Sequence, residues 1–149
     1  MTILKIITSV FILLLFPIII GLAVQAQPQA NRNTRQVGNM LQRLERSSSK
    51  FRNSLNVALV QRSVDQTQPQ NDISTFHSGL DLAIKQFRDQ FTRRLAVASD
   101  VESILQKASP LNNFMNQNTL NPRVKNDWIS VRADLNTLAN AYGVSWQWN

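Results

Sequence analysis

Few residues in this chain have side chains that could carry chemistry. The one histidine, His77, stands four residues before Asp81, so the two side chains share a face if the segment is helical. A catalytic or metal-binding histidine requires a carboxylate, a thiol or a second imidazole nearby. The chain has no cysteine. Because one imidazole–carboxylate pair does not make a mechanism, we expect His77 to be a surface or boundary residue.

Other signatures of catalysis are missing from the sequence. The two glutamates, Glu45 and Glu102, cannot supply the Glu/His ligand pattern of di-iron bundles. The four glycines are isolated from one another, so there is no phosphate-binding loop. No Gly-x-Ser-x-Gly elbow occurs either. We therefore expect a protein that is not an enzyme, with no catalytic, metal-binding or cofactor-binding residues and no cofactor.

Positive charge is concentrated in one segment of this chain, whose net charge is +7. Glu45 is the single acid between Arg32 and Arg62. Such asymmetry favours an anionic partner, either a phosphate- or carboxylate-bearing envelope polymer or an anionic lipid surface. The alternative is a solvated helix whose long side chains cover apolar edges. The candidate anion-binding face consists of Arg32, Arg35, Arg43, Arg46, Lys50 and Arg52.

Tryptophans mark the C-terminal end of the sequence. Trp146 and Trp148 follow the last helical pattern, and exposed tryptophans can dock on membranes, sugars or a partner protein. They are our candidate aromatic contact, and the alternative is a tail that folds back and closes one end of the fold. Trp128 precedes Arg132 by about one helical turn, which predicts a guanidinium resting on the Trp128 indole.

The N-terminal residues have the layout of a secretory signal peptide. Lys5 precedes an apolar run over residues 6–24, and small residues come just before Gln27. We expect a signal peptide over residues 1–26, a flexible leader over 27–33 and one domain over 34–149. The protein would then be periplasmic, secreted or on the cell surface. The run is also long enough to span a bilayer, so a retained single-pass anchor is the alternative.

Four apolar stripes at helical spacing follow, and no run of strand-like alternation is long enough to make a sheet. The sequence therefore predicts an all-α fold, an antiparallel up-and-down bundle of four helices. The stripes are Val37, Leu41, Leu44, Ser48, Phe51, Leu55 and Ala58; Ile73, Phe76, Leu80, Ala83 or Ile84, Phe87, Phe91 and Leu95; Val101, Ile104, Leu105, Ala108, Leu111 and Met115; and Trp128, Val131, Leu135, Leu138 and Tyr142.

Capping and breaking residues predict where the first two helices begin. Asn33 or Thr34 is a plausible N-cap for the first helix. Residues 61–71 are polar and contain a proline, so we expect a loop there, with Asn71 or Asp72 capping the second helix.

The later helices have clearer signals. Ser99 and Glu102 have capping-box spacing, and Pro110 should bend or split the helix that they begin. The Asn121-Pro122 dipeptide should open the fourth helix, since proline favours the first helical position. Gly143 should end that helix, with Val144 making the accompanying apolar contact.

The C-terminal part also resembles a group of small exported bacterial proteins of unknown function. The similarity is clearest over residues 98–146, where a W-x3-R-x-D-L-x2-L-A-x2-Y helix beginning at Trp128 is followed by Val-Ser-Trp. This resemblance implies export and an all-helical fold. It transfers no site residues, because no activity is attached to the group.

Together these features predict an exported, non-enzymatic bundle that acts by binding or structural contacts at the cell envelope. The expected partner is an unidentified protein, an envelope polymer or an anionic membrane surface, and export argues against nucleic acid. One alternative is a membrane-tethered bundle with residues 6–24 retained as a transmembrane helix. Others are a self-assembling module, with the first helix paired to its own copy, or a carrier of small apolar ligands beside Ser48 and Gly79.

Overall fold

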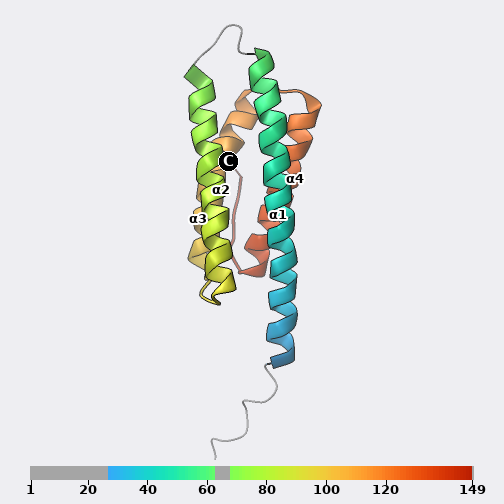
Figure 1. The fold of residues 1–149 in the computed structure, drawn as a ribbon, viewed down its shortest axis with the longest axis vertical. Coiled ribbons are helices and arrows are strands. Elements are labelled where there is room, and N and C mark those ends of the chain that lie inside the picture. The colour runs from blue at the N-terminus through green and yellow to red at the C-terminus, as the bar shows by residue number, and fades with distance from the viewer. Residues whose placement is uncertain (1–26, 63–67, 149) are drawn as a thin grey trace, which may run out of the picture. The chain divides into compact units, whose positions relative to one another are not determined.

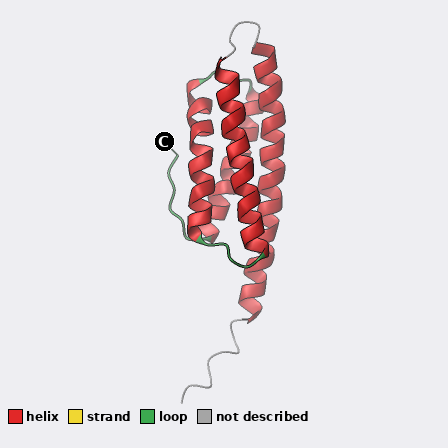
Figure 2. Ribbon diagram, turned by 60° about the vertical axis from the view of Figure 1, so that its left-hand side comes forward, coloured by secondary structure: helices red, strands yellow, loops and turns green. Residues whose placement is uncertain are grey.

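A computed structural model of the chain describes residues 27–62 and 68–148. The predicted signal peptide or anchor lies outside these ranges. Four helices make up the fold: α1 (Gln27–Arg62), α2 (Gln68–Thr92), α3 (Ala98–Gln117) and α4 (Pro122–Ala141), and no strand occurs in the described ranges (Figures 1 and 2). None of these helices combines the length and the apolar character needed to cross a bilayer.

The helices pack side by side within the compact unit Arg35–Asn149. Two ion pairs show the relative direction of α1 and α2. Glu45 of α1 contacts Arg88 of α2, and Arg52 of α1 contacts Asp81 of α2. Residue numbers therefore rise along α1 as they fall along α2. The predicted all-α antiparallel bundle of four helices is confirmed.

Helix α1 is longer than the sequence indicates. It begins at Gln27, so residues 27–33 are helical where we expected a flexible leader, and neither Asn33 nor Thr34 caps it. Pro28 lies in the first turn, where a missing N–H removes no helical hydrogen bond. Extending a formed helix by further residues also costs much less than nucleating one.

The α1–α2 connection is shorter than the expected loop over residues 61–71. Helix α1 continues to Arg62 and α2 begins at Gln68, so Asn71 and Asp72 lie inside α2 instead of capping it. The reason is again a proline in the first turn, because Pro69 is the second residue of α2.

The buried stripe of α2 differs from the prediction at two places. His77 is only 3% exposed, whereas Phe76 is 37% exposed, so the interpretation of His77 as a surface or boundary residue is wrong. The inward positions run from Ile73 through His77 to Leu80, in steps of four and three. Leu95 is 56% exposed because α2 ends at Thr92.

Helices α2 and α4 end in the same way. Gly143 and Val144 donate the paired backbone hydrogen bonds of a Schellman motif, and Gly143 has the left-handed φ of 68° that this motif requires. Val144 is buried, so the predicted helix end is confirmed. Arg94 takes the equivalent position after α2 with a φ of 60°, although glycine would adopt that conformation at lower cost.

Helix α3 runs unbroken through Pro110. The carbonyl that Pro110 leaves without its helical donor belongs to Gln106, which is exposed and can be hydrated.

The start of α3 differs from the prediction. The helix begins one residue before Ser99, and its capping bond runs from the Val97 N–H to the Asp100 carboxylate, at 2.9 Å. The predicted Ser99–Glu102 capping box is therefore wrong. All six apolar residues predicted for its stripe are buried.

Helix α4 begins as the sequence predicts. Asn121 is its N-cap and accepts a 3.0 Å hydrogen bond from the Val124 N–H, and Pro122 is the first helical residue. Trp128, Val131 and the two stripe leucines are buried, and Tyr142 is partly buried at the end of the stripe.

Candidate functional site

The basic residues of α1 do not form one face, contrary to the candidate set drawn from the sequence. At about 100° per residue, Arg35 and Arg46 lie opposite the buried stripe. Arg43 and Lys50 lie on the flank toward α4, and Arg52 lies on the flank toward α2. The side chain of Arg32 is outside the described residues.

The flank toward α4 uses its charges to hold the bundle together. Lys50 Nζ lies 2.9 Å from Asp127 Oδ1, and Arg43 Nε lies 3.6 Å from Asp134 Oδ1. The Ser47 hydroxyl donates a 2.8 Å hydrogen bond to the other oxygen of Asp134. Two carboxylates of α4, seven positions apart, therefore attach α1 along about two helical turns.

Asp127 is the more buried of these two acids. Its side chain is 3% exposed, while that of Lys50 is 67% exposed. Burial raises the pKa of Asp127, but the hydrogen bond from Lys50, the nearby Ser54 hydroxyl and the charges of Lys50 and Arg123 outweigh this effect. The pKa of Asp127 therefore lies below the ordinary 3.8, and its carboxylate is ionised at neutral pH.

The flank toward α2 contains a second polar cluster around Asp81. Arg52 Nη1 lies 3.2 Å from Asp81 Oδ2, and the Ser48 hydroxyl donates to Asp81 Oδ1 at 3.0 Å. His77 Nδ1 lies 3.3 Å from Asp81 Oδ2. Burial raises the pKa of Asp81, but these partners, His77 above all, bring it below its ordinary value.

A serine, a histidine and an aspartate therefore meet, but not in the order of a hydrolytic triad. In a triad the imidazole lies between the hydroxyl and the carboxylate, and it takes the hydroxyl proton. Here the Ser48 hydroxyl bonds directly to Asp81, and His77 Nε2 lies 3.3 Å from the backbone oxygen of Ser48. This arrangement attaches α1 to α2, and it does not prepare Ser48 for nucleophilic attack.

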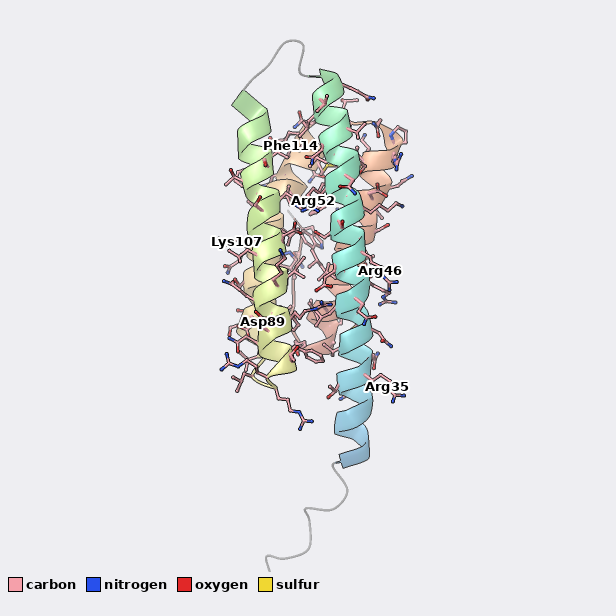
Figure 3. The ribbon with its side chains drawn as sticks, viewed as in Figure 1. Arg35, Arg46, Arg52, Asp89, Lys107 and Phe114 are labelled. Carbon is pink, nitrogen blue, oxygen red and sulfur yellow. The ribbon has the colours of Figure 1, made fainter. Side chains whose placement is uncertain are left out.

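The outward side of α1 carries a row of arginine and amide side chains. Its members all lie within about 40° of one direction around the helix axis, and all are exposed. Figure 3 shows Arg35 and Arg46 extending on the side of α1 away from α2, whereas Arg52 lies toward α2. The amide–arginine face consists of Arg35, Asn39, Gln42, Arg46 and Asn53.

This face is positively charged because no acid balances it. Arg35 and Arg46 form no ion pair with any described residue. The single acid of α1, Glu45, lies on the α2 flank and pairs with Arg88. Among the described side chains of α1, the amide–arginine face thus holds the charge that is not paired within the bundle.

The C-terminal tail folds back instead of projecting. Figure 2 shows the segment after α4 running back along the helices, and Trp146 and Trp148 are half-buried against the core. Trp148 Nε1 donates a 2.8 Å hydrogen bond to Asn136. Trp146 Nε1 is buried without a partner among the described residues. The candidate aromatic contact is therefore packed against the protein itself.

The predicted stacking of Arg132 on Trp128 is wrong. The Arg132 guanidinium carbon lies 5.1 Å from the centroid of the Trp148 ring instead. Trp128 is buried, where its ring contacts Phe51 at 5.0 Å between centroids and its Nε1 donates to Asn112. A core indole leaves no exposed face for a guanidinium, and the returning tail provides one.

Two groups of site residues were missed at the sequence level. The first is the acids Asp81, Asp127 and Asp134, which are the partners of the α1 flanks. In α2 and α4 these aspartates stand beside the apolar stripe, and α1 has many basic residues but one acid. That complementarity is the sequence signal that could have identified them. The second is the amides between Arg35 and Arg46, whose helical phase matches that of the arginines.

Comparisons with known proteins do not add to this description. No family model matches the chain, and no match was found among curated proteins or solved structures. Within the described residues, no three histidine, aspartate or glutamate side chains come together in a way that could hold a metal ion.

Proposed function

We propose that this protein is an exported, non-enzymatic helical bundle that binds anionic polymers of the cell envelope through the amide–arginine face of α1. One observation carries the proposal. Arg35 and Arg46 are exposed on an acid-free face without an ion-pair partner among the described residues, while Arg43, Lys50 and Arg52 are paired with acids of the bundle.

The chemistry of arginine suits this function. A guanidinium stays charged at all relevant pH values and presents several N–H donors in a fixed plane, which matches carboxylate and phosphate groups. Because both arginines are exposed, their attraction for a polyanion should weaken as salt shortens the screening length, which is about 10 Å at 0.1 M.

Export is part of the proposal because residues 1–26 have the layout of a signal peptide. Mass spectrometry of the protein from cells tests this part separately. A chain that starts at Gln27 supports cleavage, and one that starts at Met1 supports the tethered alternative. The aromatic tail is not part of the proposed site, because Trp146 and Trp148 pack against the core.

The binding test compares two double variants with equal changes in net charge. Arg35→Gln with Arg46→Gln removes the charge of the amide–arginine face. Lys85→Gln with Lys125→Gln removes two exposed lysines of α2 and α4 that form no ion pair with described residues. Binding to polyphosphate is measured for both at low and at moderate salt.

We expect the arginine variant to bind polyphosphate about tenfold more weakly at low salt, a difference of about 1.4 kcal/mol. The lysine variant should stay close to the unmodified protein. Equal losses in both would mean that only net charge matters, and this would contradict the proposal. Absence of binding by the unmodified protein at low salt would contradict it too.

A further inference from the structure

The amide side chains between and beyond the arginines carry information about the ligand. On the outward side of α1, Asn39 and Gln42 lie between Arg35 and Arg46, and Asn53 follows at about two more turns. From this row we infer that the ligand is a linear acidic polysaccharide that lies along α1. The inference deepens the proposed function and rests on it.

The spacing of the charges requires an extended ligand. Arg35 and Arg46 are eleven positions apart, which corresponds to about 16 Å along a helix. One phosphate or carboxylate group cannot reach both guanidinium groups across that distance. A chain with repeated acidic groups can contact both, and its intervening part then passes over Asn39 and Gln42.

The side chains that this intervening part would meet are suited to sugars. An amide has both an acceptor oxygen and a donor NH₂ group, and a sugar hydroxyl likewise donates and accepts. Polyphosphate offers acceptors only, so it supplies no donor to the carbonyl oxygens of Asn39 and Gln42. An alternation of arginine with amides therefore fits a polymer in which acidic groups alternate with hydroxyls.

Part of this row is already arranged for binding. Arg46 Nε donates a 3.1 Å hydrogen bond to the backbone oxygen of Gln42, so the guanidinium lies along the helix surface beside the Gln42 position. A side chain held in this way loses less conformational freedom when a ligand binds. The terminal nitrogens of Arg46 remain available to an acidic group.

The same face is poorly suited to a membrane surface. A helix that lies in a bilayer interface combines basic residues with Trp, Phe or Leu side chains that enter the lipid. Between Arg35 and Asn53 the amide–arginine face has no apolar member; the exposed Val57 and Val60 share its direction but come only one and two turns after Asn53, so an apolar contact with lipid would be confined to that end of the row. Charge attraction alone would leave binding to an anionic bilayer weak.

The test separates the amides from the charges. The triple variant Asn39→Ala, Gln42→Ala and Asn53→Ala keeps both arginines, and alanine favours the helix. Its matched control replaces three exposed asparagines of α3 and α4, Asn113, Asn126 and Asn140, by alanine. Each is measured against polygalacturonate, polyphosphate and phosphatidylglycerol vesicles, with circular dichroism to verify that each variant folds.

We expect the triple variant to bind polygalacturonate about five- to tenfold more weakly, which is about 1 to 1.4 kcal/mol, and polyphosphate unchanged. The control variant should match the unmodified protein on every probe. Equal weakening on both polymers, no weakening on polygalacturonate, or tighter binding to the vesicles than to polygalacturonate would overturn the inference. None of these outcomes removes the proposed function. That function fails if the arginine variant binds polyphosphate as well as the unmodified protein does, if the lysine variant loses as much affinity as the arginine variant, or if the unmodified protein does not bind at low salt.

Discussion

Helices α1 and α3 are attached to the same bundle by different means. Four ion pairs among the described residues join α1 to α2 or α4, and no ion pair there involves α3. Helix α3 instead buries apolar side chains on its neighbours, and Asn112 is its one buried polar residue. Helix α1 has an apolar stripe as well, but charged contacts border that stripe on both sides.

This difference explains how the outward face of α1 is fixed. An apolar stripe alone lets a helix rotate somewhat about its axis, because apolar contacts have no preferred direction. The pairs of Lys50 with Asp127 and of Arg52 with Asp81 act on opposite flanks, so they define the rotation of α1. The amide–arginine face must then point to solvent.

The largest effect is expected in α3, from Leu111→Ala. Leu111 is fully buried, so the substitution should lower the free energy of unfolding by about 2–5 kcal/mol. Because no charge is involved, the loss should be the same at low and at high salt. Urea unfolding followed by circular dichroism at the two salt concentrations measures it, and a strongly salt-dependent loss would contradict the contrast between the two helices.

The next effect concerns the ion pair between Lys50 of α1 and Asp127 of α4, whose two side chains are unequally buried. Lys50→Gln leaves the buried carboxylate of Asp127 without its counter-charge, at a cost of about 1–3 kcal/mol. Asp127→Asn should cost less, since the exposed Lys50 ammonium can turn into water. The same urea titration ranks the two variants. Equal losses, or a larger loss for Asp127→Asn, would show that the buried charge does not dominate this contact.

Acid should loosen the attachments of α1 in particular. The pKa values of Asp81 and Asp127 are lowered in the folded state, so below the ordinary value of 3.8 the unfolded chain binds more protons than the folded one. Their contribution to stability is therefore complete above that value and is lost as pH falls through the folded pKa values.

Stability measured from about pH 5 down to about pH 3 tests this expectation. The unmodified protein should lose stability below about pH 4, and Asp81→Asn with Asp127→Asn should give a shallower decline. Leu111→Ala is the control, since it should shift the whole curve without changing its slope. An unchanged slope in the double variant would mean that other carboxylates cause the acid sensitivity.

The apolar stripes predicted most of this fold because burial repeats along a helix with a fixed period. The stripe of α3 followed from that period, although its capping residues did not. Helix α4 followed from the period and from Asn121, Pro122 and Gly143, whose roles depend only on local backbone geometry. The ends of α1 and α2 were predicted less well. A proline such as Pro69 permits a helix to start as readily as it prevents one from continuing.

The polar part of the bundle was not predictable in the same way. Whether His77 is buried depends on Asp81 and on the backbone of Ser48, which lies on another helix. The division of the basic residues likewise depends on Asp127 and Asp134, far along the chain. Sequence reasoning placed all six cations on one face because partners on other helices do not appear in the periodicity of one helix.

Substitution of Arg43 should have the smallest effect on stability. Arg43 lies between the flank that attaches α1 to α4 and the proposed binding face. Its 3.6 Å contact with Asp134 is long, its side chain is 54% exposed, and Ser47 already donates to that carboxylate. Arg43→Gln should therefore change the free energy of unfolding by less than about 1 kcal/mol, as is usual for exposed pairs. Urea unfolding provides that number.

The same variant can then be measured with polyphosphate. If stability and binding both stay nearly unchanged, Arg43 belongs to the flank, and the binding face is limited to the row through Arg35 and Arg46. If stability stays but binding falls as far as in the double arginine variant, a polyanion competes with Asp134 for Arg43. The assignment of Arg43 to the paired residues that hold the bundle together would then be wrong, and the binding face would extend toward α4.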